Sequence, residues 1–312
     1  ELSLEGGVRK VAGVLPILCE LKKHGFSHAF IPQENAEEAA RAEGRAAYGV
    51  CSLTEIISFL KGEASPVPIA PTDIVAEAEE EIGPSDMKWV RGNESAKRGL
   101  EIAAAGGHNI LMHGAPGTGK TMLAQAFPTI IPPLTREEAV EVTSIHSAAR
   151  ALGRGLVGKA PFRAPHHTAS YPAVVGGGTV PKPGEITLAH RGVLFMDELP
   201  EYDRSVLEAL REPLESRSIT VSRARGTVTF PAHCILIASM NPCSCGKPRN
   251  RGCTCTTAAL GAYRRKISGP ILDRLDIWVG VNKVDYGKMS ERAASSEPSS
   301  AIRARVIMAR DI

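Results

Sequence analysis

The sequence contains few aromatic residues and no long apolar run, and each absence argues against a class of function. Phe, Trp and Tyr make up only 4% of the 312 residues, so stacking of nucleic-acid bases on aromatic side chains is not the expected binding mode. No apolar run approaches the roughly 20 residues that a membrane-spanning helix needs, so we expect no membrane. The 43% apolar and 23% charged residues are ordinary for a soluble globular protein of about two domains.

Cysteine is also not distributed as in a small secreted protein. Four of the seven cysteines form two Cys-x-Cys pairs within one short segment, whereas a disulfide framework has dispersed cysteines. We therefore predict a reducing, cytoplasmic compartment. The sequence begins with Glu1 rather than Met, so we expect it to be part of a longer product.

Acidic residues are absent from two long segments. Residues 1–95 contain 16 acidic and 9 basic residues, a net charge of −7, whereas the remainder contains 18 and 28, a net charge of +10. No Asp or Glu occurs between Val142 and Gly184 or between Ser216 and Leu272. Such basic segments suit a polyanion. Alternatively, their arginines reach a nucleotide or a carboxylate across a subunit interface.

Composition and periodicity divide the chain into four parts. Residues 1–62 alternate short strand-like and helix-like segments, which predicts an α/β fragment. Prolines and an acidic run predict a linker at 63–86. In 87–282, strands alternate with helices, which predicts an α/β fold with a parallel sheet covered on both faces. Residues 283–312 form the last part.

The most specific motif is GAPGTGKT, which fits G-x-x-x-x-G-K-[ST] and lies between an apolar strand-like segment and a helix-like one. Its glycines allow backbone N–H groups to turn toward phosphates, Lys120 should bridge the β- and γ-phosphates, and the Thr121 hydroxyl should bind Mg²⁺. The predicted ATP site consists of Gly114, Ala115, Pro116, Gly117, Thr118, Gly119, Lys120 and Thr121.

A second apolar strand ends in two acids. Residues 193–196 are apolar and are followed by Asp197 and Glu198. Because unpaired buried carboxylates are costly, packing alone does not explain them. We predict that Asp197 completes the Mg²⁺ site and that Glu198 polarises the attacking water. The strand CILIASMN ends in Asn241, whose amide is expected to hold this water or a γ-phosphate oxygen.

Two further groups of polar residues allow more than one interpretation. Arg274 lies between Asp273 and Asp276, so it forms either an intrachain ion pair or, as we favour, an arginine finger for the γ-phosphate of a neighbouring subunit. His166 and His167 are of metal-ligand type, but no further ligand is evident in the sequence. We favour a structural or interface role for them.

Seven motifs in order make the chain resemble the ComM/YifB family of magnesium-chelatase-like AAA+ ATPases. They are GAPGTGKT, FRAPHHTAS, VGGGTVPKPGEITLAHRGVLFMDELPE, LEALREPLE, SRARGTVTFPA, ASMNPC and SGPILDRLD. The resemblance implies an AAA+ P-loop fold with a helix-2 insert and a presensor hairpin, assembled as a hexameric ring. It also implies an ATP-driven DNA helicase that promotes branch migration in natural transformation, related to MCM motors and to the magnesium chelatase ATPase subunit.

This resemblance gives the acid-free segments a location in the fold. Residues 162–192 would form the helix-2 insert, and ITVSRARGTVTF at 219–230 the presensor hairpin. Lys182, Arg223 and Arg225 are then the predicted contacts to single-stranded or branched DNA. Contacts to phosphates are largely independent of base sequence and sensitive to salt.

The ends of the chain resemble parts of larger domains. Residues 1–62 resemble the C-terminal part of a Lon-protease-like (ribosomal S5 domain 2-like) domain. Leu15 stands where such a protease would have its lysine, and the half with the serine would precede Glu1, so proteolysis is disfavoured. Residues 283–312 resemble the start of a helical lid without its sensor arginine, so the family pattern is truncated at both ends. The alternatives are a chelatase-type motor subunit and, less favoured, a Lon-like protease.

The clustered cysteines follow Asn241 directly. The two Cys-x-Cys pairs are separated by seven residues, which is short enough for four sulfurs to meet one tetrahedral ion, and Zn²⁺ suits four thiolates. The pairs are tighter than the usual C-x₂₋₄-C spacing, so free thiols or a disulfide-linked loop remain alternatives. The candidate zinc ligands are Cys243, Cys245, Cys253 and Cys255.

Overall fold

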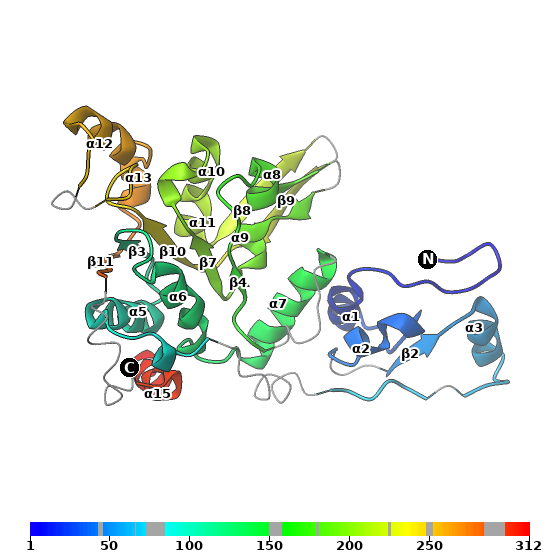
Figure 1. The fold of residues 1–312 in the computed structure, drawn as a ribbon. Helices are drawn as coiled ribbons and strands as arrows, with labels where there is room; N and C mark the ends of the chain where they lie inside the picture. The colour runs from blue at the N-terminus through cyan, green and yellow to red at the C-terminus, as the bar shows by residue number, and fades with distance from the viewer. Residues whose placement is uncertain are drawn as a thin grey trace. The chain divides into compact units, whose positions relative to one another are not determined.

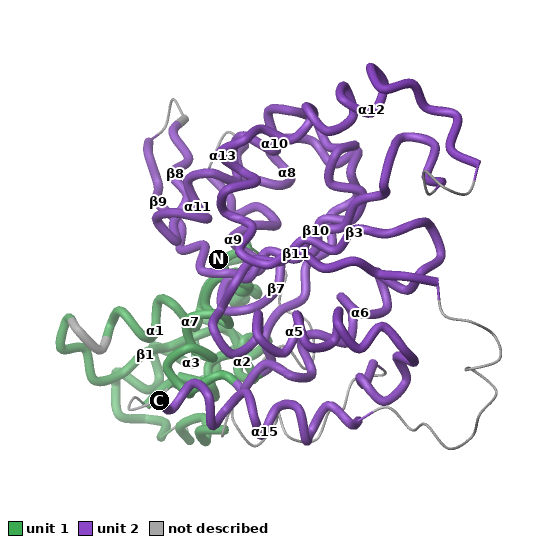
Figure 2. The backbone as a smooth tube through the Cα atoms, turned by 90° about the vertical axis from the view of Figure 1, so that its left-hand side faces the viewer, with its two compact units in different colours: residues 1–81, 134–158 green, residues 82–133, 159–312 purple. Residues whose placement is uncertain are grey.

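The computed structural model contains two compact units (Figure 2). The residues that the structure describes are 1–42, 46–65, 67–72, 85–149, 158–178, 181–223, 226–247, 252–283 and 297–312. Unit 1 comprises residues 1–81 and 134–158, and unit 2 comprises residues 82–133 and 159–312. Residues 134–158 therefore group with the N-terminal unit, although the predicted range 87–282 contains them. The predicted division into 1–62, 63–86, 87–282 and 283–312 stays a prediction.

Unit 1 is built around two parallel strands, which pair from His28 opposite Ala46 to Pro32 opposite Val50. Its elements are α1 (Val14–Lys23), β1 (His28–Pro32), η1 (Gln33–Asn35), α2 (Ala36–Ala39), β2 (Ala46–Val50), α3 (Leu53–Leu60) and α7 (Arg136–Ala148). Apolar side chains of α1 and of both strands form its core, in which Leu15 is fully buried. Leu15, which the resemblance to a Lon-like domain predicts to stand in place of a lysine, is thus part of an apolar core.

A buried carboxylate connects α7 to the rest of unit 1. The Glu38 side chain accepts hydrogen bonds from the Leu15 backbone N–H at 2.9 Å, from the Asn35 side chain at 2.9 Å and from the Ser147 hydroxyl. The Ser147 hydroxyl also accepts a hydrogen bond from the Gly13 N–H at 2.9 Å. These partners offset the cost of removing the charge from water.

Unit 2 contains a five-stranded parallel sheet with the strand order β11-β3-β10-β7-β4. The strands are β3 (Ile110–His113), β4 (Phe162–Arg163), β7 (Val193–Met196), β10 (Ile235–Met240) and β11 (Ile277–Gly280). This arrangement confirms the predicted α/β fold with a parallel sheet. The order of the strands across the sheet differs from their order in the sequence. Strands β3, β10 and β7 are therefore neighbours in the sheet although they are far apart in the sequence.

Apolar side chains cover both faces of the sheet, because successive side chains of a strand point to opposite faces. Met112 belongs to a core cluster with α5 (Glu94–Gly106), α6 (Lys120–Ala126) and α15 (Ser299–Arg310). Its neighbour Leu111 belongs to a second cluster with α10 (Arg204–Ala209) and α11 (Arg211–Ser216). The two groups of helices lie on opposite sides of the sheet (Figure 1).

The remaining elements of unit 2 are short. They are η2 (Met87–Trp89), η3 (Phe127–Thr129), α8 (Tyr171–Val175), β5 (Gly176–Gly177), β6 (Lys182–Pro183), α9 (Glu185–Leu188), η4 (Leu199–Glu201), β8 (Ser218–Arg223), β9 (Gly226–Pro231), α12 (Thr257–Arg264) and α13 (Gly269–Leu272). Strands β8 and β9 form an antiparallel hairpin, which confirms the hairpin predicted at 219–230. Among the described residues, no helix has the length and apolar character needed to cross a membrane.

Candidate nucleotide-binding site

The predicted phosphate loop connects β3 to α6 at the carboxyl end of the sheet. Gly117 and Gly119 have φ angles of 72° and 97°, which glycine adopts without steric cost. Gly114 is required for a different reason, because an added Cβ would lie 2.2 Å from the Val281 carbonyl oxygen. Its N–H donates to the Met240 carbonyl at 3.1 Å. The loop is therefore anchored to the end of β10 and packed against the end of β11.

Asn93 also supports this loop, and the sequence analysis did not identify it. Its side-chain amide donates to the Thr118 carbonyl at 3.3 Å, and its Oδ1 accepts a hydrogen bond from the Asn282 N–H at 2.9 Å. Asn93 itself has φ 54° and ψ 42° at the start of α5, a left-handed conformation that Asn tolerates better than most residues. No local motif signals this role, since both partners are distant in the sequence.

Lys120, the first residue of α6, lies buried beneath the loop. Its ammonium donates to the carbonyl oxygens of Gly114 at 2.7 Å and Ala115 at 3.1 Å, and to Asn241 Oδ1 at 3.2 Å. Burial lowers the pKa of Lys120, whereas the nearby charges of Asp197 and Glu198 act to raise it. The structure thus brings together the predicted lysine and the predicted strand-end amide.

The two predicted Mg²⁺ ligands are direct neighbours. The Thr121 hydroxyl donates to Asp197 Oδ2 at 3.1 Å. The other carboxylate oxygen, Oδ1, accepts hydrogen bonds from the Ser239 hydroxyl and from the Glu198 N–H at 3.1 Å. A hydroxyl and a carboxylate at the end of a phosphate loop fit Mg²⁺, which binds few protein oxygens and otherwise water and phosphate.

Ser239 is the second residue that the sequence analysis missed. It is fully buried in β10, and its hydroxyl also accepts a hydrogen bond from the Glu198 N–H at 3.3 Å. A polar residue within the apolar strand CILIASMN is a signal that could have indicated a partner. It did not indicate which partner, because that depends on the pairing of β10 with β7.

Glu198 has an unusual backbone conformation next to Asp197. Its φ of 52° and ψ of 48° are left-handed, which costs about 1–3 kcal/mol for a non-glycine residue and is found preferentially at functional sites. Its carboxylate is half-exposed and lies 3.7 Å from His167 Nδ1. The His167 ring contacts the His166 ring at a centroid distance of 4.1 Å. His167, expected to be structural, therefore lies beside the predicted catalytic acid.

The Arg274 side chain contacts residues outside the phosphate loop. Its guanidinium forms an ion pair with Glu215 and donates to the Pro270 carbonyl at 2.6 Å. The intrachain ion pair considered from the sequence thus exists, with Glu215 rather than Asp273 or Asp276. The finger role toward a neighbouring subunit stays a prediction.

The four clustered cysteines converge. Their sulfurs all lie within 4.8 Å of one another, and none forms a disulfide. Cys243 lies 3.1 Å from Cys245 and 3.6 Å from Cys253, measured between the sulfurs. Four sulfurs bound to one zinc ion at about 2.3 Å would lie roughly 3.8 Å apart, so the cluster fits a tetrahedral ion. The contact with Cys243 lowers the pKa of the Cys245 thiol to about 6, whereas burial raises the pKa of the Cys243 thiol to about 12.

The predicted DNA-contacting residues are only partly described. Lys182 is exposed in β6. Arg223 is the last residue of β8, where it pairs with Gly226 near the tip of the hairpin, and its side chain lies outside the described part of the chain. Arg225 also lies outside the described residues. The backbone position of Arg223 near the hairpin tip agrees with the sequence prediction, and the DNA contacts stay predictions.

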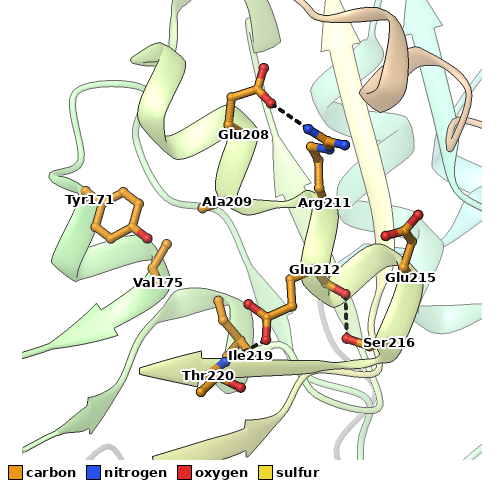
Figure 3. Close-up of a pocket in the computed structure, with 10 residues that line it drawn as sticks. All are labelled: Tyr171, Val175, Glu208, Ala209, Arg211, Glu212, Glu215, Ser216, Ile219 and Thr220. Carbon is orange, nitrogen blue, oxygen red and sulfur yellow. Dashed lines mark hydrogen bonds and ion pairs between the residues drawn. The ribbon is translucent and has the colours of Figure 1, made fainter. Parts of the chain in front are cut away.

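A separate cavity of about 480 Å³ lies between α8, α10, α11 and β8 (Figure 3). Three carboxylates line it, from Glu208, Glu212 and Glu215. Glu212 accepts a hydrogen bond from the Thr220 N–H at 3.0 Å, and Arg211 pairs with Glu208 at 3.5 Å. Its excess of acidic groups does not suit a polyphosphate, so the glycine-rich loop remains the candidate nucleotide site.

Comparison with known proteins places these features in a family context. Residues 86–289 match the family model for magnesium chelatase, subunit ChlI. The chain is 41% identical to the competence protein ComM of Haemophilus influenzae over 316 residues, which cover 100% of this chain and 62% of that protein. It is also 41% identical to the uncharacterized protein YifB of Escherichia coli over 312 residues, 100% of this chain and 61% of YifB.

A partial match extends to one protease. Lon protease 2 of Bacillus subtilis is 30% identical over 156 residues, which cover 46% of this chain and 28% of that protein. The chain spans about three fifths of the length of ComM and YifB.

Proposed function

Because the chain belongs to the ComM/YifB family of magnesium-chelatase-like AAA+ proteins, we propose that it hydrolyses ATP and uses the energy to move along DNA. One observation carries the ATPase part of this proposal. Lys120 contacts Asn241 at 3.2 Å, and Thr121 contacts Asp197 at 3.1 Å. Residues from three strand ends thus meet at one phosphate loop, as hydrolysis requires.

Each of these groups has a role in phosphoryl transfer. The loop N–H groups and Lys120 bind the β- and γ-phosphates. Thr121 and Asp197 hold Mg²⁺, which neutralises negative charge on the phosphates. Glu198 orients and polarises the attacking water, and Asn241 holds that water or a γ-phosphate oxygen. Ser239 orients Asp197 and fixes the Glu198 backbone through its two hydrogen bonds.

Replacement of the proposed catalytic acid tests this assignment in the full-length protein. Glu198→Gln should bind ATP with the wild-type affinity and lower turnover by about 10²- to 10⁴-fold, because general-base assistance is lost. Glu201→Gln is the matched control, since Glu201 lies in the same turn and pairs with Lys266 at 2.8 Å. Turnover by Glu198→Gln at the wild-type rate would refute the role of Glu198.

We also propose that Arg274 acts on the nucleotide of a neighbouring subunit, where the γ-phosphate replaces Glu215 as its partner. Mixed assemblies test this proposal. Lys120→Ala subunits retain the arginine, and Arg274→Ala subunits retain the phosphate loop, so a mixture should contain some complete interfaces and recover part of the turnover. If the two inactive proteins show no recovery on mixing, Arg274 acts within its own chain.

We propose that the protein moves along DNA and that it assembles as a hexameric ring in the cytoplasm. The basic, acid-free segments, the β8–β9 hairpin and the exposed Lys182 support a positively charged contact surface. The relative ComM is a competence protein, which supports a role in natural transformation. For this chain we propose a helicase that promotes branch migration in natural transformation or recombination. Arg223→Ala combined with Arg225→Ala should slow strand displacement by the full-length protein most strongly at low salt. The difference from wild type should shrink as the salt concentration rises, because fewer phosphate contacts give a shallower salt dependence.

A second ion is proposed for the four-cysteine cluster. The mutual distances of the sulfurs and the absence of a disulfide among the described cysteines favour Zn²⁺ bound by Cys243, Cys245, Cys253 and Cys255. Four thiolates form a closed coordination sphere, which is typical of a structural rather than a catalytic zinc site. We therefore assign this ion no step in hydrolysis.

One alternative has a specific observation in its favour. The matching family model describes a magnesium chelatase subunit, so the chain could be the ATPase motor of a complex that inserts a metal ion into a tetrapyrrole. Such a motor does not need a DNA-contacting hairpin. Stimulation of ATP turnover by DNA therefore distinguishes the two functions.

A further inference from the structure

The four-cysteine loop touches the phosphate loop. Gly246 follows Cys245 directly and has φ 72°. A Cβ atom added to Gly246 would lie 2.9 Å from Cγ and 3.2 Å from Cδ of Pro116. The Gly246 backbone therefore lies against the ring of Pro116. Pro116 lies within the glycine-rich loop whose N–H groups we propose to bind the phosphates, so the contact reaches the proposed nucleotide site.

The same loop is tied to the strand-end amide. Asn241 lies two residues before the first cysteine of the cluster, and its side chain accepts a hydrogen bond from Lys120. Helix α12 begins soon after the last cysteine. Its buried Tyr263 lies near the backbone of Asn241, which acts to lower the pKa of the Tyr263 hydroxyl against the larger, raising effect of burial. The segments before and after the cysteine loop thus both lie near Asn241, which accepts a hydrogen bond from Lys120 of the phosphate loop.

A metal ion would make this loop a rigid support. The sulfurs of Cys243, Cys245 and Cys253 lie 3.1 to 3.7 Å apart, and the Cys243 thiol donates to the Lys247 carbonyl at 3.3 Å. If no ion were bound, only contacts of this kind would hold the loop. Sulfur is a weak hydrogen-bonding group, whereas metal–thiolate bonds in a structural zinc site contribute folding free energy directly. A bound ion would therefore fix the loop geometry at Gly246.

We infer that the ion held by the four cysteines positions the phosphate loop through Gly246 and Pro116, so that nucleotide affinity depends on occupancy of the metal site. This inference rests on the zinc site proposed above. The site is then a metal-dependent support for ATP binding rather than an isolated structural appendage. Removal of the ion should weaken nucleotide binding even though the residues proposed to bind the nucleotide, among them Lys120 and Thr121, are unchanged.

The expected effect follows from the population of the binding-competent loop. The apparent dissociation constant is the intrinsic constant divided by the competent fraction. If loss of the ion leaves the loop in its binding conformation about one tenth of the time, the dissociation constant rises about tenfold. Such a change is readily measured by titration.

The first experiment compares zinc-loaded and zinc-free full-length protein. A zinc-selective chelator removes the ion while Mg²⁺ is kept in excess, and zinc content is measured by elemental analysis. Titration with a fluorescent ADP analogue then gives the dissociation constant of each form. We expect one zinc per chain before treatment and about tenfold weaker nucleotide binding after it, with recovery on adding Zn²⁺.

Two glycine variants distinguish the effect of the Gly246–Pro116 contact on nucleotide affinity from the effect of losing the metal ion. Gly246→Ala places a methyl group against Pro116, whereas Gly252→Ala meets only the Lys247 side chain, at 3.8 Å. Both positions have positive φ, 72° and 86°, so backbone strain is matched. Both variants should retain zinc. Gly246→Ala should bind the ADP analogue several-fold more weakly, and Gly252→Ala should bind it with the wild-type affinity.

The outcomes distinguish this inference from the proposals on which it depends. Absence of stoichiometric zinc would overturn the metal site and this inference with it. Zinc binding together with equal nucleotide affinity in the loaded and stripped forms would overturn the inference alone. Equal weakening by Gly246→Ala and Gly252→Ala would do the same, because strain rather than the Pro116 contact would then be responsible. Failure of the zinc-loaded protein to bind the ADP analogue would contradict the nucleotide site.

Discussion

Replacement of Ser239 by alanine tests whether a buried hydroxyl positions the carboxylates of Asp197 and Glu198, to which we assign roles in hydrolysis. The Ser239 side chain donates to Asp197 Oδ1 and accepts a hydrogen bond from the Glu198 N–H at 3.3 Å. A hydrogen bond to a charged group contributes about 1.5–3 kcal/mol. If this loss appears fully in the transition state, the rate of ATP hydrolysis at saturating ATP should fall about 10- to 150-fold.

Unit 1 offers a matched control for this experiment. Ser147 is also buried, and its hydroxyl likewise donates to a carboxylate, Glu38, and accepts a backbone N–H, from Gly13 at 2.9 Å. Ser147→Ala should destabilise the protein as much as Ser239→Ala without changing the turnover rate. Turnover is measured by phosphate release, and stability by thermal unfolding. A turnover rate of Ser239→Ala within twofold of wild type, or an equal fall in Ser147→Ala, would refute the reasoning.

Two further predictions concern the loop and the C-terminal helix. Gly114→Ala should abolish measurable nucleotide binding, because its Cβ would lie 2.2 Å from a carbonyl oxygen, whereas Gly269→Ala, which meets nothing within 4 Å, should bind normally. Hydrogen bonding to Arg305 lowers the pKa of Glu101 from its usual value of 4.5, so this pair stabilises the fold above that pH and the stabilisation is lost as the pH falls through the lowered pKa. Arg305→Ala should therefore be less stable than wild type by roughly 1 kcal/mol at pH 7. The difference should narrow on acidification below pH 4.5, and thermal unfolding at both pH values checks it.

Local motifs could be predicted from the sequence because their chemistry depends on neighbouring residues. The glycine-rich loop is recognised by the spacing of its motif, and the strand before Asp197 by its apolar run followed by two acids. The parallel sheet followed from the alternation of strands and helices, and the hairpin at 219–230 from its β-branched residues. Convergence of the four cysteines followed from their short spacing.

Contacts between distant segments could not be predicted in the same way. The partners of Ser239 depend on the pairing of β10 with β7, and the contact of Gly246 with Pro116 depends on the neighbouring positions of β10 and β3. The proximity of His167 to Glu198 arises similarly from segments brought together by the fold. Residues 134–158 group with unit 1 because α7 forms hydrogen bonds there through Ser147, and no local pattern indicates this.

The most direct test of the central claim is the rate of ATP hydrolysis by the full-length protein with and without branched DNA. An ATP-driven motor on DNA predicts that DNA increases the turnover rate and that raising the salt concentration from about 50 to 200 mM weakens this stimulation, because the contacts are to phosphates. The same turnover rate with and without DNA at low salt would contradict the account.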